Sequence, residues 1–105
     1  MRNKITIKGI FTPIYVITQK DLTVEESYIF SIMLNTSNQH EKIDYTNQAY
    51  ADIIGRDVRT ITRCINMLIK RNYIRVVGSG KKREFKLTSK IFDLKKEFEN
   101  KKGGI

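Results

Sequence analysis

Four polar side chains along residues 57–71 are spaced as on one face of a helix. Arg59, Arg63, Asn66 and Lys70 fall at positions i, i+4, i+7 and i+11, which a helix of 3.6 residues per turn brings to one side. In the major groove of DNA, arginine can make paired hydrogen bonds to guanine, and asparagine can make them to adenine. The chemistry favoured by this spacing is therefore hydrogen bonding to the edges of bases.

A solvated helix face is the alternative interpretation, because arginine and lysine are good helix formers. Such a face usually mixes charges of both signs, which pair at i and i+4. Asp57 is the only acidic residue between Arg56 and Lys82, so this stretch lacks that mixture. Thr60 and Thr62 flank the same face and could reach a phosphate or a thymine methyl group. The pattern favours a nucleic-acid contact.

A second basic cluster surrounds a short loop at residues 78–82, between two stretches typical of strands. Gly78 and Gly80 would let the loop backbone approach DNA closely, and Ser79 could bond a phosphate. A basic loop tip can enter the minor groove, where narrow A·T tracts concentrate negative potential. The alternative is a solvated hairpin tip whose lysines only keep a strand edge from aggregating. Whether the helix or the loop reads sequence stays open.

Basic charge is concentrated in the second half of the chain. Residues 1–52 carry five Lys and Arg against six Asp and Glu, whereas residues 53–105 carry fifteen against five. One-sided basic charge on a small domain is typical of a polyanion binder. The residues predicted to contact double-stranded DNA are Arg56, Arg59, Thr60, Thr62, Arg63, Asn66, Lys70, Arg75, Ser79, Lys81, Lys82, Arg83 and Lys86.

Residues suited to catalysis or metal binding are sparse. His40 and Cys64 are the only residues of their types, and they fit no zinc-site spacing. The Gly-Ser-Gly-Lys run at 78–81 lacks full phosphate-loop spacing and joins two predicted strands. The five tyrosines lack the metal or basic cluster that a nucleophile attacking phosphate needs. We therefore expect no enzymatic activity, no cofactor and no metal, with His40 solvated and Cys64 in the core.

The bulk properties indicate one intracellular domain. A chain of 105 residues has the length of a single domain, which we place at 1–100, with 101–105 as a frayed tail. No apolar run approaches the roughly 18 residues of a membrane span, and no signal-peptide pattern follows Arg2 and Lys4. One cysteine favours a reducing compartment, so we expect a cytoplasmic protein.

The periodicity of apolar residues predicts a mixed α+β chain. Extended segments are expected at 4–8 and 14–17, and a helix should run from a capping box at Thr23 to about residue 34. The polar stretch at 35–42 is typical of a loop. The other predicted elements are a short strand at 43–45, helices at 46–55 and 57–71, strands at 73–77 and 83–88, and a last helix from Ser89.

The same spacing predicts which faces are buried. The helix at 57–71 should bury one stripe, and the hairpin that follows should turn one face inward. Gly55 and Asn72 should end their helices in the left-handed conformation. The residues expected to be buried or to face inward are Ile61, Ile65, Leu68, Phe85 and Leu87, and Ile74 and Val76 should share one face of the strand at 73–77.

The last helix has a broad apolar face, made by Ile91, Phe92, Leu94 and Phe98. One interpretation is that this face packs back on the domain. The other is a dimer seam, with Ile91, Leu94 and Phe98 as the candidate contacts, while the N-terminal extended segments could also pair with a second subunit. Both interpretations remain open at the level of the sequence.

Residues of the predicted helices and hairpin resemble the winged helix-turn-helix superfamily over about 22–88. The resemblance rests on Ala51 and Ile54-Gly55 in one helix, on Asp57, Arg59, Thr60 and Ile61 at the start of the next, and on Ile65, Leu68 and Asn72-Tyr73-Ile74 at its end. It implies a three-helix core in which helix 57–71 is the recognition helix and hairpin 73–88 is the wing. Extra N-terminal strands and a C-terminal helix would flank that core.

The segment from Thr12-Pro13-Ile14 to Leu22-Thr23 looks like the winged-helix domains of plasmid and phage replication proteins. This resemblance implies a sequence-specific DNA-binding accessory protein of a plasmid or other mobile element, which marks an origin of replication or transfer. Such a protein would act as a homodimer, or as several copies on repeated sites, and would recruit larger replication or transfer proteins. The alternatives are a small transcriptional regulator and a protein-interaction module whose basic face meets an acidic partner.

Overall fold

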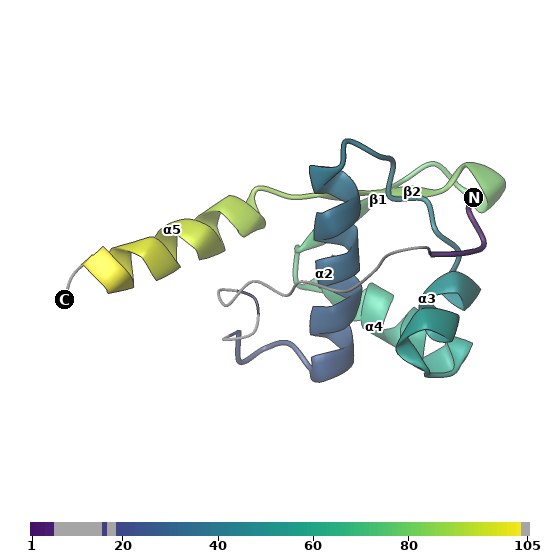
Figure 1. The fold of residues 1–105 in the computed structure, drawn as a ribbon, viewed down its shortest axis with the longest axis horizontal. Helices are drawn as coiled ribbons and strands as arrows, with labels where there is room; N and C mark the ends of the chain where they lie inside the picture. Colours follow the sequence, from purple (N-terminus) through teal and green to yellow (C-terminus); the bar gives the residue numbers. More distant parts are fainter. Residues whose placement is uncertain (6–15, 17–18, 104–105) are drawn as a thin grey trace.

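Successive helices are followed by a hairpin and a last helix in the computed structural model, which describes residues 1–5, 16 and 19–103 (Figure 1). The elements are α2 (Val24–Asn38), α3 (Asn47–Ile54), α4 (Val58–Lys70), β1 (Ile74–Val77), the short 3-10 helix η1 (Gly80–Lys82), β2 (Glu84–Leu87) and α5 (Lys90–Gly103). A mixed α+β chain is thereby confirmed. The predicted extended segments at 4–8 and 14–17 lie mostly outside the described residues.

Polar caps set the start of three helices. Thr23 and Glu26 form the predicted capping box of α2, each side chain accepting a hydrogen bond from the other residue's backbone N–H. The side chains of Thr46 and Asp57 accept backbone N–H groups at the starts of α3 and α4. Gly55, with φ 78°, ends α3 in the left-handed conformation, as expected.

Helix α2 continues one turn beyond its predicted end. The expectation of a loop at 35–42 is wrong for 35–38, where the polar side chain of Thr36 is satisfied within the helix. Thr36 is only 3% exposed, and its hydroxyl donates to the carbonyl of Ile32 at 2.8 Å. A serine or threonine that bonds back to residue i−4 can remain in a helix interior. His40, with φ 60°, then follows the C-cap and turns the chain.

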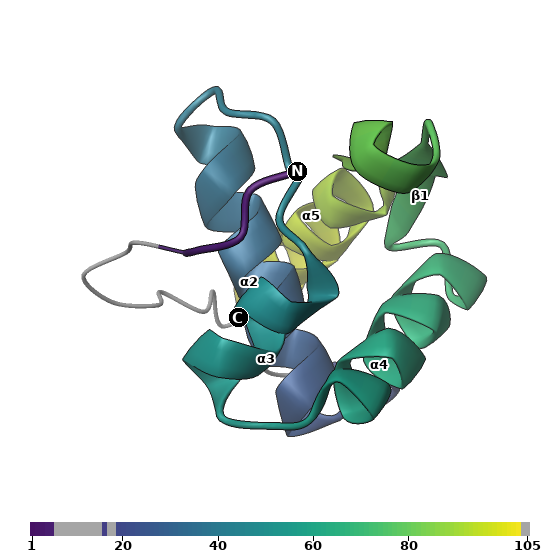
Figure 2. The same ribbon diagram turned by 90° about the vertical axis from the view of Figure 1, so that its right-hand side faces the viewer.

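The core lies where α2 packs against α3 and α4 (Figure 2). Phe30 and Met33 of α2, Tyr50 of α3 and Leu68 of α4 are fully buried. Burial of such large apolar side chains is the main favourable contribution to the free energy of folding. The predicted stripe of α4, at residues 61, 65 and 68, is confirmed as part of this core.

The hairpin pairs Ile74 with Leu87 and Val76 with Phe85 in antiparallel register. Phe85 is buried as expected, and Ile74 is buried too, but Val76, which was predicted to share a face with Ile74, is 47% exposed. The reason is the position of β1 at the outer edge, since β2 is the strand bonded to the body through Phe85 N–H and the Ile43 carbonyl. The expected strand at 43–45 is present only as two isolated bridges.

Helix α5 projects away from the rest of the molecule, and its base is firmly attached (Figure 1). Ile91 and Leu94 are buried in the core cluster. The Lys90 ammonium donates to the Arg71 carbonyl at 2.9 Å and lies 4.2 Å from the centroid of the Tyr73 ring. The first turn therefore packs on the domain, which is one of the two interpretations that the sequence left open.

Candidate nucleic-acid interface

Helix α4 separates its apolar and polar residues cleanly. Ile61, Cys64, Ile65 and Leu68 are buried, and Met67 and Ile69 are half-buried at the border. The opposite face presents Arg59, Thr62, Arg63, Asn66 and Lys70, all exposed. At about 100° per residue these five positions span one arc of the helix, so α4 offers a continuous polar face to solvent.

Among the described residues, no salt bridge involves the cations on this face. In the part of the chain that the structure describes, the salt bridges with α2 and with the 41–44 segment involve Arg2, Arg56 and Arg71. Arg59, Arg63 and Lys70 take part in none of them. Residues 57–70 hold these three cations against the single carboxylate of Asp57, so α4 keeps a net positive charge whose field extends into solvent.

Asp57 is the one acidic side chain at the start of α4, and its carboxylate is occupied. It accepts the backbone N–H of Thr60 at 2.8 Å, as an N-cap does. The hydrogen bonds with the side chain and backbone of Thr60 lower the pKa of Asp57, and the nearby charges of Arg59 and Arg63 lower it further. Asp57 thus serves the helix terminus and remains ionised.

Thr62 connects α4 to α3, and the sequence did not predict this. Its hydroxyl donates to the Val58 carbonyl at 2.9 Å and accepts from Asn47 Nδ2 at 3.0 Å. The threonine therefore helps to fix the angle between the two helices. Thr60 is half-buried next to the cap.

The tip of the hairpin is a tight turn that presents two lysines. Ser79, Lys81 and Lys82 are exposed around η1. The Lys82 N–H donates to the Ser79 carbonyl at 3.0 Å. Gly78 has a φ of 75°, and a Cβ at that position would collide with the carbonyl oxygen of Lys82. The shape of the tip therefore depends on glycine at 78.

Alanine at position 78 is expected to destabilise the hairpin more than alanine at position 80. Gly80 also has a positive φ, 56°, but a Cβ there would meet nothing within 4 Å. Gly80→Ala should therefore lower the free energy of unfolding only by the strain of a left-handed alanine, about 1–2 kcal/mol. Gly78→Ala should lower it further, because its Cβ would also clash with the backbone. Urea unfolding of both variants measures the difference, and equal midpoints would contradict this account of the tip.

Arg83 is placed differently from its lysine neighbours. Its guanidinium donates to the Tyr45 carbonyl at 3.0 Å and lies 4.6 Å from the centroid of the Phe85 ring. Burial lowers the pKa of Arg83. The side chain thus ties the hairpin to the 43–45 segment, and it is less available to a ligand than Lys81 and Lys82 are.

The other predicted DNA contacts lie beside α4 and on the strands of the hairpin. Arg56 is exposed and pairs with Glu25 at 3.2 Å, and Lys86 pairs with Glu84 at 3.5 Å on the outer face of the hairpin. Arg75 lies opposite Lys86 on that face. Exposed ion pairs contribute little, typically under about 1 kcal/mol, so they are exchanged readily for a phosphate.

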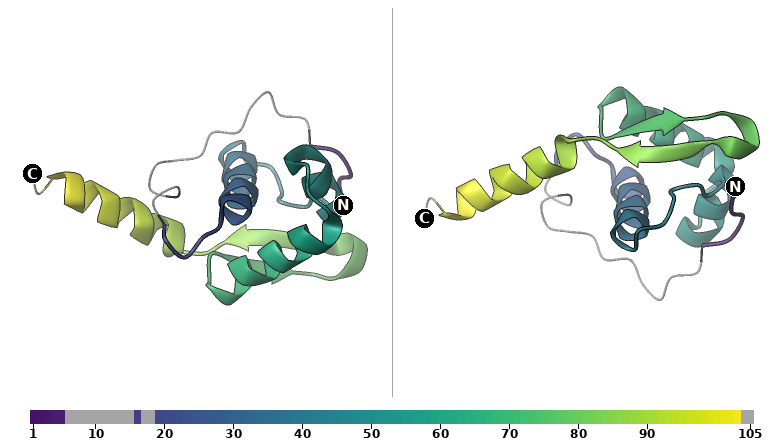
Figure 3. Two further views of the ribbon diagram at one scale, coloured as in Figure 1. Left: turned by 90° about the horizontal axis from the view of Figure 1, so that it is seen from below. Right: turned by 90° about the horizontal axis from the view of Figure 1, so that it is seen from above.

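Helix α4 and the hairpin occupy the same side of the molecule, and α2 lies behind them (Figure 3). The view in Figure 2 shows the same arrangement. The structure therefore brings the elements that carry the two basic clusters to one side. α5 points away from them toward one end (Figure 3).

Residues at the N-terminus brace this side, and sequence reasoning missed them. The N–H of Arg2 donates to the Asp44 carbonyl at 3.0 Å, and its guanidinium pairs with Glu41 and Asp44 and lies 4.1 Å from the centroid of the Tyr45 ring. The Met1 nitrogen donates to the Lys81 carbonyl at 3.3 Å. The one sequence feature that could have indicated these contacts is Arg2, the only arginine in the slightly acidic first half of the chain.

The described residues provide neither a metal cluster nor a membrane-spanning helix. No group of three or more His, Cys, Asp or Glu is placed there to hold a metal ion. Among the helices within the same residues, none combines enough length and apolar character to cross a bilayer. His40 is exposed, and Cys64 is buried, which raises the pKa of its thiol.

Comparison of the chain with protein-family models, with curated proteins and with solved structures finds no match. The arguments for function therefore rest on the residues and their geometry.

Proposed function

We propose that the protein binds duplex DNA sequence-specifically, with α3, the turn at 55–57 and α4 acting as a helix-turn-helix. In this proposal α4 is the recognition helix, and β1, η1 and β2 form the wing. The order of α2, α3, α4 and hairpin, with α2 behind α3 and α4, supports a winged helix-turn-helix arrangement. A helix whose polar face is free of other elements can enter a major groove.

The observation that carries the proposal is the exposed polar face of α4, whose cations form no salt bridge among the described residues. Arg59, Arg63 and Asn66 are the residue types that discriminate guanine and adenine, and all three are exposed. The exposed Lys81 and Lys82 at the tip add charge suited to phosphates or to a narrow minor groove. In this proposal α4 makes the base-specific contacts, and the wing adds affinity that does not depend on the DNA sequence.

The proposed biological role is that of an accessory protein of a plasmid or other mobile element that marks an origin of replication or transfer. The support for this role is the sequence resemblance at 12–23, of which residues 16 and 19–23 lie within the described part. A single small domain gives a limited footprint, so a homodimer or several copies on repeated sites would increase affinity. Larger replication or transfer proteins are the proposed partners of the bound complex.

Binding to a pool of mixed duplexes should weaken steeply with salt. If roughly five to eight phosphates are neutralised, the slope of log affinity against log salt should be about −4 to −7. Fluorescence anisotropy of labelled duplexes at several salt concentrations measures this slope. Lys96→Ala, a charge change on the projecting α5, is the matched control and should leave the slope unchanged. No duplex binding at about 50 mM salt would contradict the proposal and favour a protein-interaction module.

A further inference from the structure

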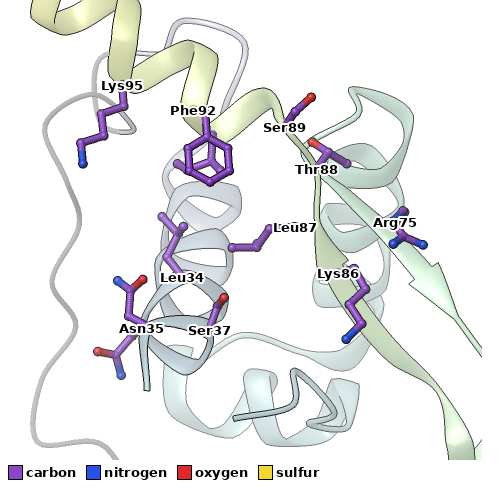
Figure 4. Close-up of a pocket in the computed structure, with 12 residues that line it drawn as sticks. Leu34, Asn35, Ser37, Arg75, Lys86, Leu87, Thr88, Ser89, Phe92 and Lys95 are labelled. Carbon is purple, nitrogen blue, oxygen red and sulfur yellow. The ribbon is translucent and has the colours of Figure 1, made fainter. Parts of the chain in front are cut away.

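An open groove of about 640 Å³ lies between the C-terminal end of α2, the end of β2 and the start of α5 (Figure 4). It belongs to neither α4 nor the hairpin tip. The tip is at the opposite end of the hairpin from α5 (Figure 1). A ligand in the groove would therefore leave the proposed recognition helix and the tip of the wing uncovered.

The groove has an apolar floor with one unusually exposed aromatic side chain. Leu34 and Ile91 are nearly buried beneath it, and Leu87 is half-buried. Figure 4 shows Leu87 pointing from β2 toward α2 and the Phe92 ring directed down toward Leu34. Phe92 is 72% exposed, although the floor beside it is apolar. Exposed apolar surface of this kind is typical of an interaction site.

The charged residues that line the groove are all basic. Arg75, Lys86 and Lys95 contribute cations, and no acidic residue is among the described residues that line it. Lys86 is paired with Glu84 at 3.5 Å, an exposed ion pair that a carboxylate of the ligand would have to exchange. The remaining polar lining consists of amides and hydroxyls, including Asn35, Ser37 and Thr88. The groove thus combines an apolar floor, a basic rim and neutral hydrogen-bonding groups.

We propose that this groove docks an acidic peptide segment of a partner protein, one that inserts a bulky apolar side chain beside Phe92. Carboxylates of the segment would face Lys95, Lys86 and Arg75, and the apolar side chain would cover Leu34 and Leu87. Complementary charge of this kind steers association and selects among partners, while a buried apolar anchor supplies most of the affinity.

Charge argues against the other occupants. A second copy of the chain would bring a net charge of +9 to a basic groove, and α5 itself carries five lysines against three acidic residues. A DNA backbone would match the cations, but it has no apolar group to cover Phe92. The acidic, apolar segment is the occupant that satisfies both features of the site.

Selection from random peptides displayed on phage tests the proposal, with the full chain as bait. The enriched peptides should combine aspartate or glutamate with a leucine, phenylalanine or tryptophan. A synthetic copy of an enriched peptide should shift the amide resonances of Leu34, Leu87 and Phe92 in a ¹⁵N-labelled sample. The Kd of this peptide should be roughly tenfold higher for the Phe92→Ser variant, and likewise for the Lys95→Glu variant. Lys82→Glu, at the hairpin tip, is the matched charge control and should change it little.

Two results would overturn the inference. Resonance shifts confined to α4 and the hairpin tip would show that the peptide only imitates a polyanion. A concentration-dependent dimer that Phe92→Ser abolishes would assign the groove to a second copy. Because Phe92 and Lys95 lie outside the proposed DNA contacts, duplex binding by both variants should be unchanged, so failure of this inference is distinguishable from failure of the proposed function.

Discussion

Replacement of both Arg59 and Arg63 by alanine is expected to lower affinity for a selected duplex by a factor between about 30 and about 20,000. Each arginine bonded to a guanine in bidentate fashion contributes about 1–3 kcal/mol of discrimination, and every 1.4 kcal/mol is about tenfold in Kd. Both side chains are exposed on the polar face of α4 and take part in no salt bridge among the described residues. Anisotropy with the duplex recovered from a random pool, and with a scrambled duplex, measures the loss.

The informative control is Lys82→Ala. Lys82 lies at the hairpin tip, where a phosphate contact would be independent of sequence. Its removal should weaken the selected and scrambled duplexes alike and reduce the salt slope by about one. The arginine variant should instead lose preference for the selected duplex. Equal, uniform losses in both variants would exclude α4 as the element that reads bases.

Phe85→Ala is expected to cost about 3–5 kcal/mol of the free energy of unfolding. Phe85 is only 2% exposed, so truncation would leave a cavity beneath the hairpin. Its backbone N–H donates to the Ile43 carbonyl at 2.8 Å, and Arg83 stacks on its ring. Loss of the ring should also weaken the packing of the hairpin on the body, while the backbone hydrogen bond to Ile43 is retained. Urea unfolding followed by circular dichroism measures the change.

Phe92→Ala is the matched control, because it makes the same substitution at a position that is 72% exposed. A surface change of this kind should shift stability by no more than about 0.5 kcal/mol. Similar losses in the two variants would mean that the base of α5 is packed more tightly than the structure shows.

Local patterns predicted the elements that position the candidate site. The caps at Thr23, Thr46 and Asp57, and the left-handed residues Gly55 and Asn72, are where the sequence placed them. These features depend on neighbours within a few residues, so spacing alone identifies them. The buried stripe of α4 was predictable for the same reason, because periodicity reports which face is apolar.

Contacts between distant segments were not predictable. Arg83 follows Lys81 and Lys82 in the sequence, yet its guanidinium bonds the carbonyl of Tyr45, and nothing local indicates that distant partner. Val76 shares a face of the outer strand β1 with the buried Ile74, as the alternation predicts. It is nevertheless 47% exposed, because the core does not extend as far as Val76. In both cases the outcome depends on where the hairpin rests on the body, which is a tertiary property.

The attachment of α5 at its base has a geometric consequence. Thr88 donates its backbone N–H to the Tyr73 carbonyl, and Lys90 bonds the Arg71 carbonyl just past the end of α4. The direction of the projecting helix is therefore set relative to α4. A helix lying in a major groove fixes an orientation around the duplex axis. If α4 lies in a major groove as proposed, α5 would always point in the same direction around the duplex axis. Copies bound at neighbouring sites would then present α5 on the same side of the DNA only when whole helical turns separate the sites.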